Sequence, residues 1–313
     1  MVNTRETKNV HTMSKELKLL LIALTSLAIV GCSGVGTENN GNVSEDLSFL
    51  YVKSLISNGV NYTPSSGDID HCNHSERYLT YEGNKIIKEE IISSLTYPED
   101  PSWNQSSHKV ITYTYDGLSC VGKYADGSQY AYIEFLDDSF LRKKVEIVDD
   151  TKYVREYDGK KIVKESYHIG DVLQWEDLYE YDGLRASFIR NTYKLENAHL
   201  VSRTVSGSIL YLDDTYLRIA LSETHAVNYL NEQRVVRLYN TYEGKKLIKQ
   251  EEKVEGTDNG YDFSGTSSVC NFEYDGLKCT SEYSQYSVSK TPPYDEHYGM
   301  LYHKAEAEIE YMK

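Results

Sequence analysis

The segment from Asp68 to Glu76 holds the densest group of side chains that could bind a metal. It reads Asp-Ile-Asp-His-Cys-Asn-His-Ser-Glu, so His71, Cys72 and His74 are the imidazole and thiol ligands. Such side chains bind zinc or copper when three or four of them converge on one point. The surrounding residues favour a loop before a strand, and a polar loop without metal is the simpler interpretation. We therefore expect no cofactor and keep these three residues as candidate ligands.

Neighbouring carboxylates were tested for catalytic or calcium chemistry. The pairs at 137–138 and 213–214 recur in similar surroundings, which favours a hairpin turn over calcium, because a calcium site needs about six or more oxygens. Glu176 and Asp177 lie beside Trp175, but adjacent residues of a strand point to opposite faces and cannot act together across a cleft. The sequence also lacks a nucleophile elbow, a P-loop and a zinc-protease motif. We therefore lean towards a protein that is not an enzyme.

Four aromatic residues on predicted loops are candidate binding residues, because exposed aromatic side chains often anchor ligands. They are Tyr97, Trp103, Trp175 and Tyr261.

The N-terminus reads as a secretion signal. A basic start at Met13 is followed by a 12-residue apolar run over 19–30 and then by Gly31-Cys32. A membrane-spanning helix needs roughly 20 apolar residues, so this run is too short. The ending resembles a bacterial lipobox, and this resemblance implies that Cys32 is lipidated and becomes the first mature residue. It implies a signal peptide over 1–31, with Met13 as an alternative start.

The remaining chain divides into a flexible tether over 32–43, rich in Gly, Asn, Ser and Thr, and one domain over 44–313. The lipobox resemblance and Ser33 favour the bacterial outer membrane through a lipid anchor, with the periplasmic and surface faces both open. The net charge is −15, which argues against nucleic acid as a partner; a protein or glycan partner is compatible. Four cysteines could form disulfides in three connectivities: Cys72, Cys120, Cys270 and Cys279.

The chain repeats itself. Residues 81–89, 157–165 and 242–250 share one pattern that begins Tyr-Asp/Glu-Gly, and a second pattern, Tyr/Phe-x-Tyr-Asp-Gly-Leu, follows at 113–118, 179–184 and 272–277. A third, Leu-Asp-Asp flanked by aromatic residues, occurs at 135–142 and 211–218. Asp-Gly between alternating apolar residues is a strong hairpin signal. The 29 tyrosines suit strands with one half-exposed face.

These repeats predict an all-β fold, an antiparallel meander of hairpins in about three cycles of six strands that forms a large twisted or curled sheet. Tight turns are expected along one rim and irregular loops along the other. One short helix is predicted near the N-terminus, with Ser44 as its cap, Leu47, Leu50, Tyr51 and Leu55 as its apolar stripe, and Asn58-Gly59 as its end.

The Tyr-x-Tyr-Asp-Gly-Leu segments resemble the YD repeats of Rhs-type shell proteins and, more closely, uncharacterised Bacteroidetes lipoproteins built from similar hairpins. The resemblance covers most of residues 75–310 and carries no activity with it. In Rhs repeats a Gly-Arg follows the Tyr-Asp after a spacer, whereas Gly follows Asp directly here.

Together these patterns predict a lipid-anchored, non-enzymatic binding or structural scaffold that presents variable loops. Two alternatives remain open at this point: an envelope enzyme that acts on glycan, and an immunity-type lipoprotein whose acidic surface neutralises a toxin.

Overall fold

The computed structural model describes residues 51–63, 66–196, 199–214, 216, 218–227, 233–244, 246–258, 261–288 and 299–311. These ranges hold eighteen strands and one short 3-10 helix, η2 (Pro101–Trp103). The strands are β1 (Val52–Tyr62), β2 (Ile69–Glu82), β3 (Lys85–Thr96), β4 (Gln105–Asp116), β5 (Ser119–Tyr124), β6 (Gln129–Phe135), β7 (Lys143–Val148), β8 (Thr151–Asp158), β9 (Lys161–Ile169), β10 (Val172–Asp182), β11 (Arg185–Glu196), β12 (His199–Tyr211), β13 (Ile219–Val227), β14 (Gln233–Glu243), β15 (Lys246–Asp258), β16 (Tyr261–Asp275), β17 (Lys278–Tyr286) and β18 (Leu301–Tyr311). No helix among the described residues has the length and apolar character needed to cross a membrane.

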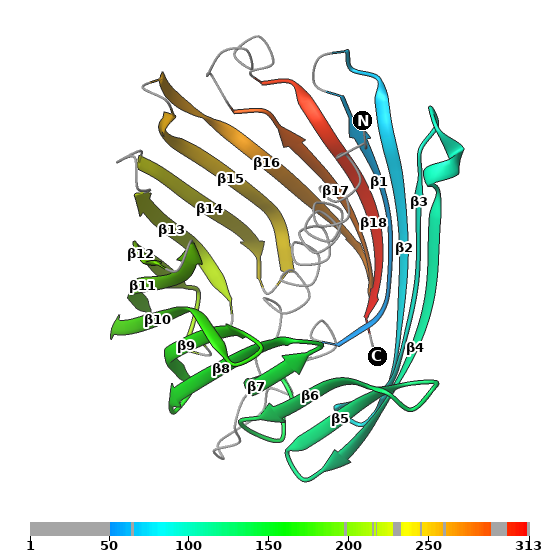
Figure 1. The fold of residues 1–313 in the computed structure, drawn as a ribbon, viewed down its shortest axis with the longest axis vertical. Coiled ribbons are helices and arrows are strands. Elements are labelled where there is room, and N and C mark those ends of the chain that lie inside the picture. Colours follow the sequence, from blue (N-terminus) through cyan, green and yellow to red (C-terminus); the bar gives the residue numbers. More distant parts are fainter. Residues whose placement is uncertain are drawn as a thin grey trace.

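The strands form one closed antiparallel barrel (Figure 1). Each strand pairs with its neighbours in sequence, and β18 pairs with β1 through contacts such as Ser57 with Ala307 and Gly59 with Ala305. Closure leaves no free sheet edge on which another chain could add a strand. A ring of this strand number is also too wide for side chains to fill its whole interior.

The two faces of the wall differ sharply. On β18 the alternate residues His303, Ala305 and Ala307 are buried, whereas Glu306 and Glu308 between them are exposed. The buried face is the concave one, because groups from distant strands approach one another on it. Arg77 on β2 thus contributes to lowering the pKa of Glu146 on β7, although β3 to β6 lie between them. The buried face therefore lines the lumen.

The apolar core lies against the inner wall near the rim of tight turns. Its larger cluster draws on β1, β2 and β15 to β18, with Leu55, Leu79, Leu247, Phe272 and Ile309 among its buried members. A smaller cluster joins β5 and β6, namely Cys120, Ile133 and Phe135. The core is thus a belt on the inner wall.

The recurring tyrosines before the tight turns have one structural task. Tyr115 donates a hydrogen bond of 3.1 Å to the carbonyl of Ile86, at the start of the preceding strand. Similar bonds of 2.9–3.2 Å join Tyr81 to Val52, Tyr157 to Lys143, Tyr181 to Ile162, Tyr242 to Ile219 and Tyr274 to Leu247. All six accepting residues border a register shift of the ladder. The hydroxyls therefore supply donors where β-bulges interrupt the backbone pairing.

The Leu-Asp-Asp repeats are also structural. In the first of them Asp137 accepts a hydrogen bond from the Ser139 backbone N–H and an ion pair from Arg142, and the turn places Phe140 at a φ of 55°. In the second, Arg218 pairs with Asp213, and Tyr216 also has a φ of 55°. The carboxylates at these turns hold hairpins together, in agreement with the hairpin interpretation.

The predicted large twisted or curled sheet is wrong, because the wall is a closed barrel, and the predicted N-terminal helix is wrong as well. The sheet closes because β1 and β18 are complementary in register, a property that no local turn signal reports. The part of the helix prediction that lies in the described residues forms strand β1, where Val52, Leu55 and Ser57 face inward. The spacing of Leu55 and its neighbouring apolar residues fits a helical period. This segment is nevertheless a strand, because β1 pairs with a neighbouring strand on each side. Ser44, Leu47 and Leu50 lie outside the described residues.

We predict that replacing Tyr115 by Phe lowers the free energy of unfolding by about 1–2 kcal/mol, because the Ile86 carbonyl loses its donor in a half-buried position. Urea unfolding followed by circular dichroism measures this change. Tyr132→Phe is the matched control, because the Tyr132 hydroxyl bonds Glu134 on the outer face. Equal effects of the two substitutions would contradict the bulge-capping role.

Candidate functional site

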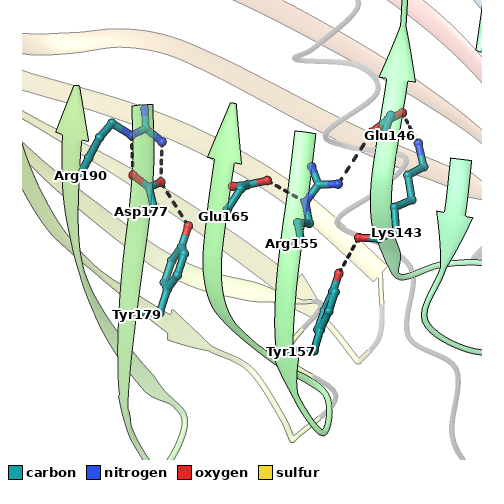
Figure 2. Close-up of polar contacts among 8 residues, drawn as sticks. All are labelled: Lys143, Glu146, Arg155, Tyr157, Glu165, Asp177, Tyr179 and Arg190. Atoms are coloured by element: carbon teal, nitrogen blue, oxygen red, sulfur yellow. Dashed lines mark hydrogen bonds and ion pairs between the residues drawn. The ribbon is translucent and has the colours of Figure 1, made fainter. Parts of the chain in front are cut away.

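The inner wall of β7 to β11 carries a ladder of paired charges (Figure 2). Lys143 donates to Glu146 at 2.5 Å, and Arg155 lies between Glu146 and Glu165, at 3.8 and 2.6 Å. Burial alone would raise the pKa of Glu146, but Lys143, Arg155 and Arg77 outweigh it and hold this pKa below its usual value. Lys143, Glu146 and Arg155 therefore form mutual ion pairs on the lumen side of these strands.

The ladder ends at a buried carboxylate on β10. Asp177 is 1% exposed and accepts two hydrogen bonds of 2.6 Å from Arg190 on β11, with a third, of 3.3 Å, from Tyr179. The Arg190 guanidinium also stacks over the Trp175 ring, 4.0 Å from its centroid. This fixed guanidinium is shared between a carboxylate and an indole, so both groups have defined positions in the wall.

Three aromatic rings continue from Arg190 along the inner wall. Trp175 is stacked with Tyr167 at 5.7 Å between centroids, and Tyr167 lies 4.8 Å from Tyr153. Arg155 lies over the Tyr153 ring, 5.5 Å from its centroid. The result is a half-buried aromatic surface with a cation at each end, which can accept a ligand that has flat apolar faces and polar edges.

A second polar group lines the lumen on β18, β1 and β2. His303, which is 6% exposed, bonds Asn61 through Nδ1 at 2.9 Å. Its Nε2 atom has no hydrogen-bond partner, and neither does Oδ1 of Asn73, another buried atom. The Asn73 side chain packs directly on Gly59, since a Cβ on Gly59 would lie 2.1 Å from Asn73 Oδ1 and 3.0 Å from His303 Cε1, so only glycine fits at this position.

The outer wall has a different character, with ion pairs along many strands. These pairs are 2.8–3.3 Å long and include Lys53–Glu310, Lys88–Glu90, Lys164–Glu176, Arg237–Glu255, Lys249–Glu251 and Lys304–Glu306. Several lie in mid-strand, on the face opposite the core. The same face also exposes large apolar side chains, among them Leu178 and Ile189.

The candidate metal ligands do not converge. His71 lies near His303, whose pKa it helps to lower, so it belongs to the lumen side. Cys72 and His74 lie on the opposite, outer face of the strand, where His74 is bonded to Asn58 and Glu76. Among the described residues no three His, Cys, Asp or Glu side chains form a metal-binding group. Strand periodicity separates residues that are close in sequence.

The four predicted disulfide cysteines are free thiols in the structure. Cys120, Cys270 and Cys279 are buried on the inner wall. Cys270 pairs in register with Tyr283, and Cys279 with Tyr274, so these two thiols are offset along adjacent strands. The lipidation candidate, Cys32, lies outside the described residues, and its modification stays a prediction.

The predicted aromatic binding residues fall into separate groups. Trp175 is part of the lumen surface described above. Tyr97 packs against Trp103, at 6.1 Å between centroids, and against His71, at 5.4 Å, near the loop rim. Tyr261 begins β16, and its side chain lies outside what the structure describes. The structure thus brings two of the four together and places a third in the lumen.

Sequence reasoning missed Arg155, Glu165, Arg190, Asn73 and His303. One signal was available: Arg155, Arg190 and Glu165 occupy the apolar-facing register of strands that otherwise alternate. A charge at such a position predicts a buried pair or a polar lumen.

Comparisons with known proteins identify no family. No family model matches the chain, and no curated protein matches it. Among solved structures, the chain is similar to a porin-like protein from Bacteroides uniformis, with 10% identity, a TM-score of 0.43, and coverage of 69% of this chain and 94% of that one. It is also similar to two mutants of the Rh. blastica porin, each with 7% identity, a TM-score of 0.38, and coverage of 83% of this chain and 100% of the other. Identities this low carry no information about activity.

The function expected from the sequence needs correction. That expectation placed function on variable loops at the rim of a curled sheet, whereas the wall closes on itself and its organised side chains line the lumen. The scaffold and glycan-enzyme hypotheses relied on those loops and the immunity hypothesis on an acidic surface, and all three are withdrawn. The resemblance to YD repeats also finds no support in the comparisons.

We predict that Arg190→Leu lowers the free energy of unfolding by about 3–5 kcal/mol, because it leaves the Asp177 carboxylate buried and unpaired. The double variant Asp177→Leu/Arg190→Leu should lose less than the single one. Denaturant titration of the three proteins measures this. Arg237→Leu, on the outer wall, is the control and should cost less than about 1 kcal/mol. A double variant no more stable than Arg190→Leu would contradict the assignment.

A second prediction concerns pH. Burial chiefly, together with the nearby His71, lowers the pKa of His303 to about 4, although the Val60 backbone carbonyl opposes both effects. Between pH 6.5 and 4 the unfolded chain binds a proton that the folded chain does not, so stability falls with falling pH across this window. Across this whole window, protonation linked to His303 should lower the free energy of unfolding by about 3 kcal/mol. Urea unfolding at pH 7 and 4.5 should show a smaller loss in His303→Phe than in wild type; equal losses would contradict the prediction.

Proposed function

We propose that the protein is a hollow barrel that works in water and takes a small polar ligand into its lumen. The observation that carries this proposal is the contrast between the two faces of the wall. Ion pairs occur in mid-strand on the outer face, beside exposed apolar side chains such as Leu178 and Ile189, while the inner face holds ordered aromatic and charged groups.

The outer face supports a barrel surrounded by water. Lys164, Arg237 and Lys304 lie within strands, several residues from either end. A Lys or Arg that faces lipid at mid-membrane costs about 2–4 kcal/mol, so a wall with many of them would be unstable in a bilayer. The location that we propose remains the bacterial outer membrane, with the barrel beside the bilayer.

The inner face supports a ligand of moderate size. Its charges are already paired with one another, as with Arg155 and Glu165 at 2.6 Å, so the lumen does not require a strongly charged ligand. The rings of Tyr153, Tyr167 and Trp175 offer flat apolar contact beside polar edges. Ligand pockets commonly combine such surfaces with a few oriented polar groups.

A channel across the outer membrane is the second candidate, and the closed ring of eighteen strands favours it, because barrels of about 16–18 strands can leave an aqueous channel. The charged outer wall opposes it. The two candidates differ in what the outer face must contact, and this difference can be measured.

We predict that residues 44–313 stay monodisperse without detergent and do not float with phosphatidylethanolamine/phosphatidylglycerol vesicles. The thermal unfolding midpoint should be measured with neutral saccharides, nucleosides and amino acids, each added at high concentration. At least one of these classes should raise the midpoint, since a ligand that binds only the folded state stabilises it. Flotation with vesicles together with solute efflux would favour the channel. No stabilisation by any class would contradict lumen binding.

A further inference from the structure

One turn recurs around the rim, and its position occurs a third time where the barrel closes. At each place an aromatic residue ends a strand, donates its N–H to a leucine carbonyl at 2.9 Å, and pairs in register with the first residue of the next strand. The pairs are Phe135–Lys143, Tyr211–Ile219 and, between β18 and β1, Tyr311–Val52. Residues 136–142 and 212–218 join the first two pairs within the chain. The third pair forms the seam between the last strand and the first.

The sequence before Val52 matches those two turns. The motif Asp-x-Ser/Thr-aromatic-Leu occurs at 137–141 and 213–217, with one residue between it and the following strand. It occurs again at 46–50, with Tyr51 between it and Val52. Residues 46–50 lie outside the described ranges, so the comparison rests on their sequence and on the register of β1. Repeats of one sequence pattern form the same structural unit.

Tyr51, the residue between the motif and β1, lies where the other two turns have an arginine. Its ring packs on Tyr81, with centroids 5.8 Å apart. The equivalent tyrosines of the other cycles each lie near an arginine, which opposes the rise in their pKa that burial causes: Arg142 near Tyr157, and Arg218 near Tyr242. The chain therefore enters β1 as it enters β7 and β13.

The aromatic residue of the motif closes a cage around a lysine. Lys85 Nζ lies 5.1 Å from the ring centroids of both Tyr115 and Phe140, and these two rings are perpendicular, at 88°. The second turn repeats the cage at 5.2 Å with Lys161, Tyr181 and Tyr216. An ammonium group is attracted to the faces of aromatic rings. Each cage therefore fastens its turn to a strand outside the turn's own hairpin.

The third cycle has the same lysine and tyrosine beside the seam. Lys246 begins β15 as Lys85 begins β3, and its Nζ lies 5.1 Å from the ring centroid of Tyr274. We propose that residues 46–50 dock at this part of the rim as the third copy of the turn, with the Phe49 ring packed on Lys246 and Tyr274. The occupant is the chain's own N-terminal segment, because its motif ends one residue before the strand that borders the site.

This docking holds the seam together by contacts where β6 and β7 are joined by the chain itself. It links the start of β1 to β15 and β16, on the far side of β17 and β18. It also fixes the N-terminal segment at the rim of tight turns, away from the irregular loops, and it is independent of any ligand in the lumen.

Photo-crosslinking of the full chain tests the position of the segment. Phe49→p-benzoylphenylalanine should crosslink to the peptides that hold Lys246, Tyr274 or Tyr311, as identified by mass spectrometry. The matched control is Phe140→p-benzoylphenylalanine, which should crosslink to the peptides that hold Lys85 or Tyr115. The proposal is overturned if position 49 crosslinks to another part of the chain or to a second copy, or if it gives no crosslink while position 140 does.

A double-mutant cycle in the full chain tests the contact itself. Phe49→Ala and Lys246→Met, combined, should depart from additivity by about two- to fivefold in the unfolding equilibrium constant, the range of an exposed cation–π contact. Urea unfolding measures this constant. Phe140→Ala with Lys85→Met should show a coupling of similar size, because that contact is present in the structure, whereas Phe49→Ala with Lys85→Met should be additive. Additive effects of Phe49→Ala and Lys246→Met would overturn the proposed contact.

Discussion

The hydrogen bond from a tyrosine hydroxyl to a carbonyl beside a β-bulge is the interaction on which the barrel depends most. It recurs on six hairpins at the rim of tight turns. A bulge increases the local twist and bend of a strand, and a wall must bend continuously to close. The hydroxyl offsets the backbone bond that the bulge interrupts. Curvature, tyrosine content and repeat spacing therefore have one common cause.

Closure then fixes the chemistry of the two faces. Once β18 pairs with β1, every alternate residue faces a confined space. Long polar side chains on that side meet partners from other strands, as Arg155 meets Glu146 and Glu165. The ion pairs of the outer wall, such as Lys304 with Glu306, are exposed and contribute little to stability. The inner pairs thus define the lumen, whereas the outer pairs keep the wall hydrated.

The sequence predicts local structure well and closure poorly. Turns such as Asp116-Gly117 and Asp182-Gly183 are visible because Gly at positive φ has a strong local preference, and both lie at φ 59°. The pairing of Ser57 with Ala307 joins residues about as far apart as the chain allows, and nothing local encodes it. The N-terminal strand was mistaken for a helix because Leu55 and its neighbours satisfy both periods over so short a stretch.

The candidate site was hidden for the same reason. The polar group around His303 takes Gly59 and Asn61 from β1, Asn73 from β2 and His303 from β18, so its parts become neighbours only in the closed ring. Gly59 in particular was read as the end of a helix, although its lack of a side chain matters because of what stands on the strands beside it. Conversely, His71, Cys72 and His74 are adjacent in sequence but divided by the wall. In a barrel of this kind, residues that act together are in register on neighbouring strands. Residues that are adjacent in sequence lie on opposite faces of the wall.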